Sequence, residues 1–169
     1  RALAWIPPIT GRAFDPDGTL VVNEYGQLYN GLPDFYALLQ EASLAGVPFD
    51  AVGIQAHAPY DTAWPLEHLQ HYLDFYASLG KEIHITEFTP TSNGMPVLGS
   101  PWRGVWDEAQ QAEYSEHFYR MCFANPAVEA ITWWDFCDVN AWLPEGGMLR
   151  EDLSPKPVYE ATRRLIREE

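Results

Sequence analysis

Polar and aromatic residues directly follow four short apolar runs of this 169-residue chain. The first group is Asn23-Glu24-Tyr25, the second is Gln55-Ala56-His57, the third is Glu87, and the fourth extends from Trp134 to Asp138. Carboxylates and amides form hydrogen bonds with hydroxyl groups, and indole rings stack on the apolar faces of sugar rings. Brought together, these side chains would suit a neutral, polyhydroxylated ligand.

The elements that must position these groups alternate between strand-like and helix-like patterns. Short apolar runs predict strands at residues 20–23, 51–55, 83–86 and 130–136. Apolar residues at helical spacing predict helices at 32–45, 65–79, 107–124 and 155–167. Gly46 and Gly80 are placed to end the first two helices. Strands that alternate with helices at this period indicate right-handed βαβ units and a parallel sheet.

Four βα units amount to half of a (β/α)8 barrel, which typically takes about 250 residues. A doubly wound α/β sheet is the structural alternative, but no strand is followed by a glycine-rich phosphate loop. Half a barrel is therefore the expected fold. Functional residues of such barrels sit at the C-terminal ends of the strands, where the four groups fall. By strict alternation along its strand, His84 should point away from Glu87 and pack beneath a helix.

The chain is strongly acidic, with a formal net charge of −14 and a sequence pI of about 4.6. A field of that sign repels nucleic acids and anionic membrane surfaces, so neither is expected as a partner, whereas a neutral ligand is not repelled. No apolar run approaches the roughly 18 residues of a membrane-spanning helix, and no signal-type segment opens the chain.

Metal and disulfide chemistry have little support in the sequence. His68 and His71 lie one turn apart on a predicted helix, a spacing that could hold a metal. Helices of a barrel lie outside the rim, so a solvated helix face is the expected explanation, and we expect neither a metal site nor a cofactor. Cys122 and Cys137 belong to no CxxC pair and are expected to be buried as small hydrophobic residues.

Five segments resemble glycoside hydrolase family 10, the endo-1,4-β-xylanase family. KEIHITEFTP is similar to the nucleophile strand of the family, and FDAVGIQAHAP to the preceding strand with its Gln-x-His. AITWWDFCDVNAWL resembles the last strand, DPDGTLVVNEYG the fifth strand, and SPKPVYEATRRLI the closing helix. The resemblance runs in unbroken order from Asp15 to Ile166, which makes it more specific than any single motif.

The resemblance implies that residues 15–169 supply strands five to eight of a (β/α)8 barrel. It implies a retaining endo-β-glycosidase that acts on β-1,4-xylan or a related plant polysaccharide, without a cofactor and in a secreted or periplasmic location. Glu87 matches the nucleophile, and His57 matches the histidine that orients it. The implied sugar contacts are Asn23, Tyr25, Gln55, Trp134, Asp138 and Trp142. Trp102 and Trp106 in the loop at 88–106 could reshape the cleft.

The Asn-Glu sequence at the end of the first apolar run suggests that Glu24 is the acid/base. The two carboxyl groups of a retaining glycosidase lie roughly 5–5.5 Å apart, and in family 10 they end the fourth and seventh strands. Two predicted helices and one strand separate Glu24 from Glu87, which makes two βα units rather than three. Glu24 therefore matches the fifth strand. The Trp-Asp-x-x-Asn-Glu segment that carries the acid/base in the family is not found in these 169 residues.

The N-terminal half of the barrel is thus expected to be largely absent. Residues 1–14 are a poorly assignable remnant, in which RALAWIPP resembles part of the third strand. Four strands would leave two unpaired sheet edges and an uncovered apolar interior, so we expect a missing segment or a second copy in a homodimer to complete the fold. Two functions remain open: a xylan hydrolase whose acid/base lies outside this segment, and a non-catalytic carbohydrate-binding remnant.

Overall fold

A single parallel sheet organises the computed structural model, which describes residues 10–57, 65–98 and 104–168. Its strands lie side by side in chain order: β1 (Val21–Glu24), β2 (Ala51–Ile54), β3 (Glu82–Phe88) and β4 (Val128–Trp133). All three pairings are parallel. The predicted alternation of strands and helices and the parallel sheet are therefore confirmed.

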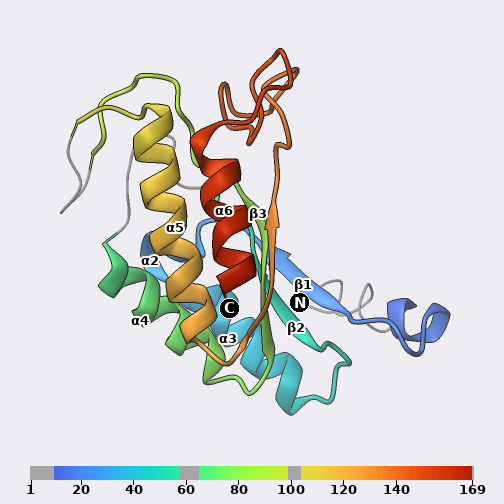
Figure 1. The fold of residues 1–169 in the computed structure, drawn as a ribbon. Coiled ribbons are helices and arrows are strands. Elements are labelled where there is room, and N and C mark those ends of the chain that lie inside the picture. The colour runs from blue at the N-terminus through green and yellow to red at the C-terminus, as the bar shows by residue number, and fades with distance from the viewer. Residues whose placement is uncertain (1–9, 58–64, 99–103, 169) are drawn as a thin grey trace.

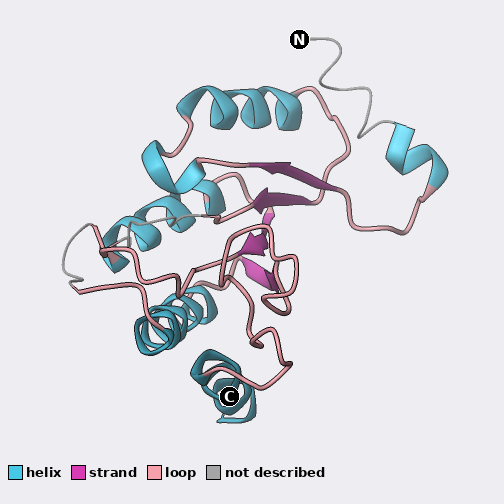
Figure 2. Cartoon of the chain, turned by 90° about the horizontal axis from the view of Figure 1, so that it is seen from above, coloured by secondary structure: helices cyan, strands magenta, loops and turns pink. Residues whose placement is uncertain are grey.

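Helices connect the strands and lie together on one side of the curved sheet (Figure 1, Figure 2). They are α2 (Gln27–Asn30), α3 (Pro33–Leu44), α4 (Leu66–Ala77), α5 (Glu108–Ala124) and α6 (Pro157–Glu168). Local sequence sets several of their ends. The Asp107 side chain accepts a hydrogen bond from the backbone nitrogen of Gln110 and caps α5. Gly46 and Gly80 follow α3 and α4 with φ of 71° and 67°, a conformation that glycine adopts without a steric penalty.

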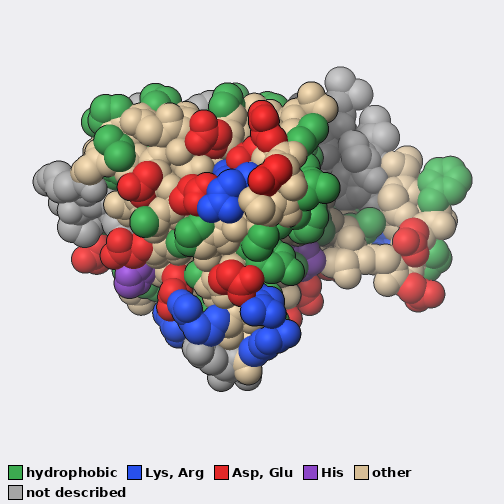
Figure 3. Space-filling view, turned by 45° about the horizontal axis from the view of Figure 1, so that its top comes forward, with side chains coloured by type: hydrophobic (Ala, Val, Ile, Leu, Met, Phe, Trp, Pro, Cys, Tyr) green, Lys and Arg blue, Asp and Glu red, His purple; other side chains and the backbone are tan. Residues whose placement is uncertain are grey.

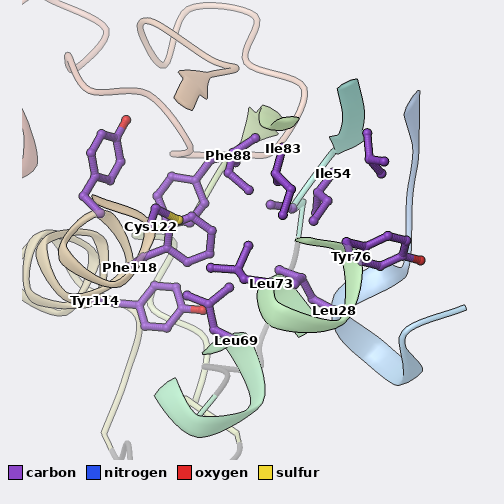
Figure 4. Close-up of a cluster of buried hydrophobic side chains, with 14 of the residues drawn as sticks. Leu28, Ile54, Leu69, Leu73, Tyr76, Ile83, Phe88, Tyr114, Phe118 and Cys122 are labelled. Atoms are coloured by element: carbon purple, nitrogen blue, oxygen red, sulfur yellow. The ribbon is translucent and has the colours of Figure 1, made fainter. Parts of the chain in front are cut away.

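The hydrophobic core lies between the sheet and these helices (Figure 4). Ile54 of β2, Ile83 of β3 and Leu73 of α4 are fully buried. Phe88, at the end of β3, stacks on Phe118 of α5 with ring centroids 4.1 Å apart. This contact fixes the end of the strand that carries Glu87 against a helix.

The core confirms the expected burial for one of the two cysteines and also contains a tryptophan that the sequence placed at the cleft. Cys122 is fully buried in it, whereas Cys137 is partly exposed, and both thiols are free. Burial raises the pKa of the Cys122 thiol. Trp106 is also fully buried, with its ring against Tyr114, so it does not shape a cleft. Trp102 lies outside the described residues.

An irregularity in β3 changes which residues share a face. The pairing of β3 with β4 shifts register between Ile83 and His84 and again between Ile85 and Phe88. Ile83, Ile85 and Phe88 are all buried in the helix-covered core, so one extra residue separates the last two. His84 lies on the opposite face, where its ring nitrogen is 3.3 Å from Glu82 Oε2. The expectation that His84 packs beneath a helix is therefore wrong, because strict alternation fails at a bulge.

The face of the sheet that these helices leave open is not the apolar surface expected from the sequence. Asn23, Gly53, His84 and Thr132 contribute mainly polar or small groups to it, with the partly exposed Val21 beside them. A polar surface of this kind can hold hydrogen-bonding side chains in place, and it does so near the C-terminal ends of the strands. The segment RALAWIPP falls outside the described residues, and residues 10–14 form a short helical turn.

Candidate active site

Glu87 lies near the C-terminal end of β3, where two neighbouring elements supply hydrogen bonds to its carboxyl group. Asn23 Nδ2, from β1, donates to Glu87 Oε1 at 3.0 Å. His57 Nε2, from the segment that follows β2, lies 2.7 Å from Glu87 Oε2. Both oxygens are thereby oriented by the protein, as a reacting carboxylate requires. The three residues lie far apart in the sequence and meet because parallel strands end at the same edge.

Asn23 reaches Glu87 because β2, which lies between β1 and β3, has a glycine at the crossing point. Asn23 pairs with Gly53 in the register of the two strands. A Cβ atom on Gly53 would lie 2.5 Å from Asn23 Oδ1, which is closer than side chains can approach. The Thr86 hydroxyl donates to Asn23 Oδ1 at 2.8 Å, so the amide NH2 group is turned toward Glu87.

Gly53→Ala is therefore expected to displace the Asn23 amide and to lower the free energy of unfolding by about 1–3 kcal/mol. Urea denaturation followed by circular dichroism would measure the loss. The double variant Gly53→Ala/Asn23→Ala removes the amide that the new methyl group meets, so its loss should be smaller than the sum of the two single losses. Strict additivity would show that the contact with Asn23 is not the cause.

Two tryptophans flank the His57 ring. The Trp142 ring lies 4.4 Å from it, and the Trp134 ring lies 5.9 Å away in an edge-on arrangement. Each indole is about half exposed, so part of it is available to a ligand. Asp135 holds the chain at Trp142, because its two carboxylate oxygens accept from the backbone nitrogens of Trp142 and Leu143 at 2.9 and 3.2 Å.

The two loops that follow β3 and β4 are joined by buried polar side chains. Gln111 of α5 donates to the carbonyl oxygens of Pro90 and Glu145. Lys156 donates to Ser92 Oγ and to the same Glu145 carbonyl. These bonds give the loop that carries Trp142 a rigid base.

A cavity of about 600 Å³ opens above Glu87. Its walls combine aromatic rings with a few polar groups; they are formed by Tyr25, Gly26, Gln27, Leu28, Tyr29, Gln55, Ala56, His57, Glu87, Trp134 and Trp142. Within the described part of the chain, Glu87 is the one carboxylate among these residues. A concave site with aromatic walls and one oriented carboxylate suits a sugar chain better than a charged ligand.

A family model covers nearly the whole chain. Residues 9–165 match that of glycosyl hydrolase family 10. The chain belongs to glycosyl hydrolase family 10. The resemblance read from the strand motifs is thereby confirmed, and with it the assignment to a family of (β/α)8 barrel hydrolases.

Individual family 10 proteins give the same result. The chain is 33% identical over 177 residues to endo-1,4-beta-xylanase B of Thermotoga neapolitana, over 99% of this chain and 48% of that protein. It matches the structure of xylanase 10B from Thermotoga petrophila RKU-1 in complex with xylobiose with a TM-score of 0.80 and 27% identity, over 99% of this chain and 52% of that one. Native xylanase 10B from Thermotoga maritima gives a TM-score of 0.79 and 28% identity, over 98% and 52%. The family 10 chain thus spans about half the length of these relatives.

Most of the site residues predicted from the sequence come together in this family 10 chain. Tyr25, Gln55, His57, Glu87, Trp134 and Trp142 line the cavity. Asn23 does not line it but contacts Glu87 directly. Tyr29, which was not predicted from the sequence, also lines the cavity, from α2. The sequence feature that could have indicated this short helix is the QLYN segment between two glycines, Gly26 and Gly31, both of which have positive φ in the structure.

Asp138 lies apart from the other predicted sugar contacts and is not among the cavity residues. Its carboxylate forms an ion pair with Lys156, with 2.7 Å between Oδ2 and Nζ, and also accepts from the backbone nitrogen of Gly147. The Lys156 side chain is 1% exposed, so a buried ammonium group needs this carboxylate as its counter-charge. Asp138 therefore neutralises the buried ammonium group and does not line the cavity above Glu87.

Glu24 faces away from Glu87. Asn23 and Glu24 are consecutive in β1, so their side chains point to opposite faces of the sheet, and Asn23 is the one that contacts Glu87. On the helix side, burial raises the pKa of the Tyr76 hydroxyl, and the negative charge of Glu24 raises it further. This position agrees with the strand count, which removes Glu24 as a candidate acid/base.

The surface of the family 10 chain carries its acidic residues widely. Figure 3 shows Asp and Glu side chains spread over one face, with Lys and Arg in a few small groups among them.

His68 and His71 of α4 each pack beside the Tyr72 ring. Among the described residues, no three His, Cys, Asp or Glu side chains form a group that could hold a metal ion. No described helix has the length and apolar character needed to cross a membrane.

Proposed function

We propose that this chain is part of a retaining endo-β-glycosidase that hydrolyses β-1,4-xylan or a related plant polysaccharide. The observation that carries the proposal is the Glu87 carboxylate, held by Asn23 and His57 beneath an aromatic-walled cavity. The relatives support the choice of substrate, because several are named endo-1,4-beta-xylanases and one was solved with xylobiose.

In this mechanism Glu87 attacks the anomeric carbon of the bound sugar. A bond forms between a Glu87 oxygen and C1, the glycosidic bond breaks, and the leaving oxygen takes a proton from a second carboxylic acid. Water then attacks C1, gives its proton to that second carboxylate, and releases Glu87. Trp134, Trp142 and Tyr25 would stack on the sugar rings, while Gln55 would bind a hydroxyl group.

The second carboxylate has to come from outside the described cavity residues, where Glu87 is the one carboxylate. We infer that β1 to β4 correspond to strands five to eight of the family barrel. Strands β1 and β4 are the edges of the described sheet, and each has one side open to a further strand. A further segment of the protein would close the barrel and bring the acid/base to roughly 5–5.5 Å from Glu87, whereas a second copy of this chain would close the barrel without supplying the acid/base motif.

The alternative is a carbohydrate-binding protein without hydrolytic activity, which the presence of one carboxylate among the described cavity residues favours. One experiment separates the two functions: the natural full-length protein and this chain alone are each incubated with xylohexaose. The products are followed by NMR of the anomeric protons, binding is followed by calorimetry, and sedimentation velocity reports assembly. We expect the full-length protein to release β-anomers first.

Other results would change the proposal. Saturable binding without turnover by the full-length protein would favour the alternative, and α-anomers formed first would exclude a retaining mechanism. Full hydrolytic activity from a compact monomer of this chain alone would contradict the need for a completing segment.

A further inference from the structure

The Thr89 hydroxyl lies behind His57, on the side of the ring opposite Glu87. Thr89 lies two residues after Glu87 in the sequence and is fully buried. Its Oγ1 atom donates to the backbone carbonyl oxygen of Glu87 at 3.0 Å. A carbonyl oxygen only accepts, so this bond uses the single hydrogen of the hydroxyl group.

The same oxygen atom lies 3.5 Å from His57 Nδ1. Because the hydroxyl hydrogen points to the Glu87 carbonyl, Oγ1 presents lone pairs to the imidazole ring. A ring nitrogen without a hydrogen would face those lone pairs with its own, which is repulsive. The contact is favourable when Nδ1 carries a hydrogen and donates it to Thr89. At 3.5 Å this bond is long, so it selects a tautomer rather than supplying much stability.

The opposite side of the ring then determines how the proton is shared with Glu87. His57 Nε2 and Glu87 Oε2 are 2.7 Å apart, a distance that requires one hydrogen between them. If Glu87 is ionised, that hydrogen is on Nε2; if Glu87 is protonated, Nε2 accepts it. In both cases Nδ1 keeps its own hydrogen, so Nε2 is the nitrogen that exchanges a proton with the carboxyl group.

We propose that Thr89 is a positioning residue that fixes the Nδ1–H tautomer of His57 and so presents Nε2 to Glu87. This inference deepens the proposed function and rests on it only for its effect on turnover. The hydroxyl group of Thr89 does not touch the ligand cavity; it acts through the imidazole ring and through the backbone of Glu87.

NMR of the histidine rings in the full chain tests the tautomer without any substrate. Two-bond correlations between the ring nitrogens and carbon-bound hydrogens distinguish a protonated from an unprotonated nitrogen, and a His57→Gln variant assigns the signals. We expect Nδ1 of His57 to remain protonated at the alkaline end of a pH series, where a neutral ring carries one hydrogen. An unprotonated Nδ1 beside a protonated Nε2 in the wild-type chain would overturn the proposal, whatever the function proves to be.

Three variants connect this signature to Thr89. Thr89→Val keeps the shape and removes the hydroxyl, so unprotonated Nδ1 should appear in part of the molecules. Thr89→Ser keeps the hydroxyl and should retain the wild-type spectrum. Thr91→Val is the matched control, since Thr91 is equally buried in the same loop but donates to Pro144 instead; it should leave the His57 signals unchanged.

Turnover gives an independent readout in the natural full-length protein. Thr89→Val should lower kcat by about tenfold with KM little changed, because outer hydrogen bonds orient a histidine without binding the ligand. Thr89→Ser should restore most of the activity. A Thr89→Val protein with the wild-type ring spectrum and wild-type kcat would refute the role of the hydroxyl. If Thr89→Val does not fold, the wild-type and Thr89→Ser ring spectra still decide the tautomer.

Discussion

Replacing Glu87 with glutamine is expected to abolish xylo-oligosaccharide hydrolysis by the natural full-length protein. Glutamine has nearly the same shape but an uncharged amide that does not attack C1, so kcat should fall by on the order of 10⁴-fold. Binding should persist, because the aromatic walls of the cavity are unchanged. Initial rates give kcat, and calorimetry with xylohexaose gives the affinity.

A carboxylate on the same strand provides the matched control. Glu82, at the start of β3, is half exposed and lies beside His84, away from the cavity. Glu82→Gln should leave kcat within about twofold of wild type, since a surface carboxylate contributes little. Undiminished turnover in Glu87→Gln would remove Glu87 as the nucleophile.

A second test separates a chemical role of Glu87 from a structural one. Glu87→Ala leaves space beside Asn23 and His57 for a small external nucleophile such as azide. With an activated aryl xyloside, azide should attack C1 from the face that Glu87 normally uses and give the α-glycosyl azide. A variant that stays inactive with azide, although it is folded and binds the aryl xyloside, would argue against attack from this position.

Replacing Lys156 with methionine is expected to destabilise the protein by about 3–5 kcal/mol, because it leaves a buried partner charge uncompensated. The Lys156 side chain is 1% exposed and its Asp138 partner 10%. The ammonium group also donates to Ser92 and to the Glu145 carbonyl oxygen, so its loss affects the loops after β3 and β4 together. Urea denaturation measures the change in the free energy of unfolding.

An exposed ion pair of α6, the helix that begins directly after Lys156, provides the contrast. Arg163 pairs with Glu160, three residues earlier on α6, with both side chains about half exposed. Arg163→Met should cost no more than about 0.5 kcal/mol. The double variant Lys156→Met/Asp138→Leu should recover part of the loss, because no unpaired charge remains. Equal losses for Lys156→Met and Arg163→Met would show that burial does not increase the contribution of the Lys156–Asp138 pair to the free energy of unfolding.

The pattern of residues in the sequence was sufficient to predict most of the strands and helices and most of the residues of the candidate site. Apolar runs and helical spacing located the strands β1 to β4 and four of the five helices α2 to α6 of the described residues, because burial of one face imposes a period on the sequence. Parallel strands place their C-terminal ends at one edge. The strand order in the sequence was therefore enough to predict that His57, Glu87 and Trp134 would meet.

Local periodicity could not show which side chains would find partners across the fold. Asp138 belongs to the same sequence motif as the cavity tryptophans, yet its carboxylate pairs with Lys156, 18 positions later, instead of lining the cavity. Only the packing of the fold shows that this lysine is buried. Because of the bulge in β3, His84 lies on the face opposite to the one predicted from alternation with Glu87. The extra residue that breaks the alternation has no recognisable signal in the sequence.

The amino-acid sequence by itself thus determined the family, the order of the strands and the carboxylate that reacts in the proposed mechanism. Tertiary structure alone decided how that carboxylate is held: Asn23 reaches it across Gly53, and His57 lies between it and Thr89. Hydrogen-bond geometry depends on distances of a few tenths of an ångström between distant segments. Such distances follow from the packing of the whole sheet against its helices rather than from any local pattern.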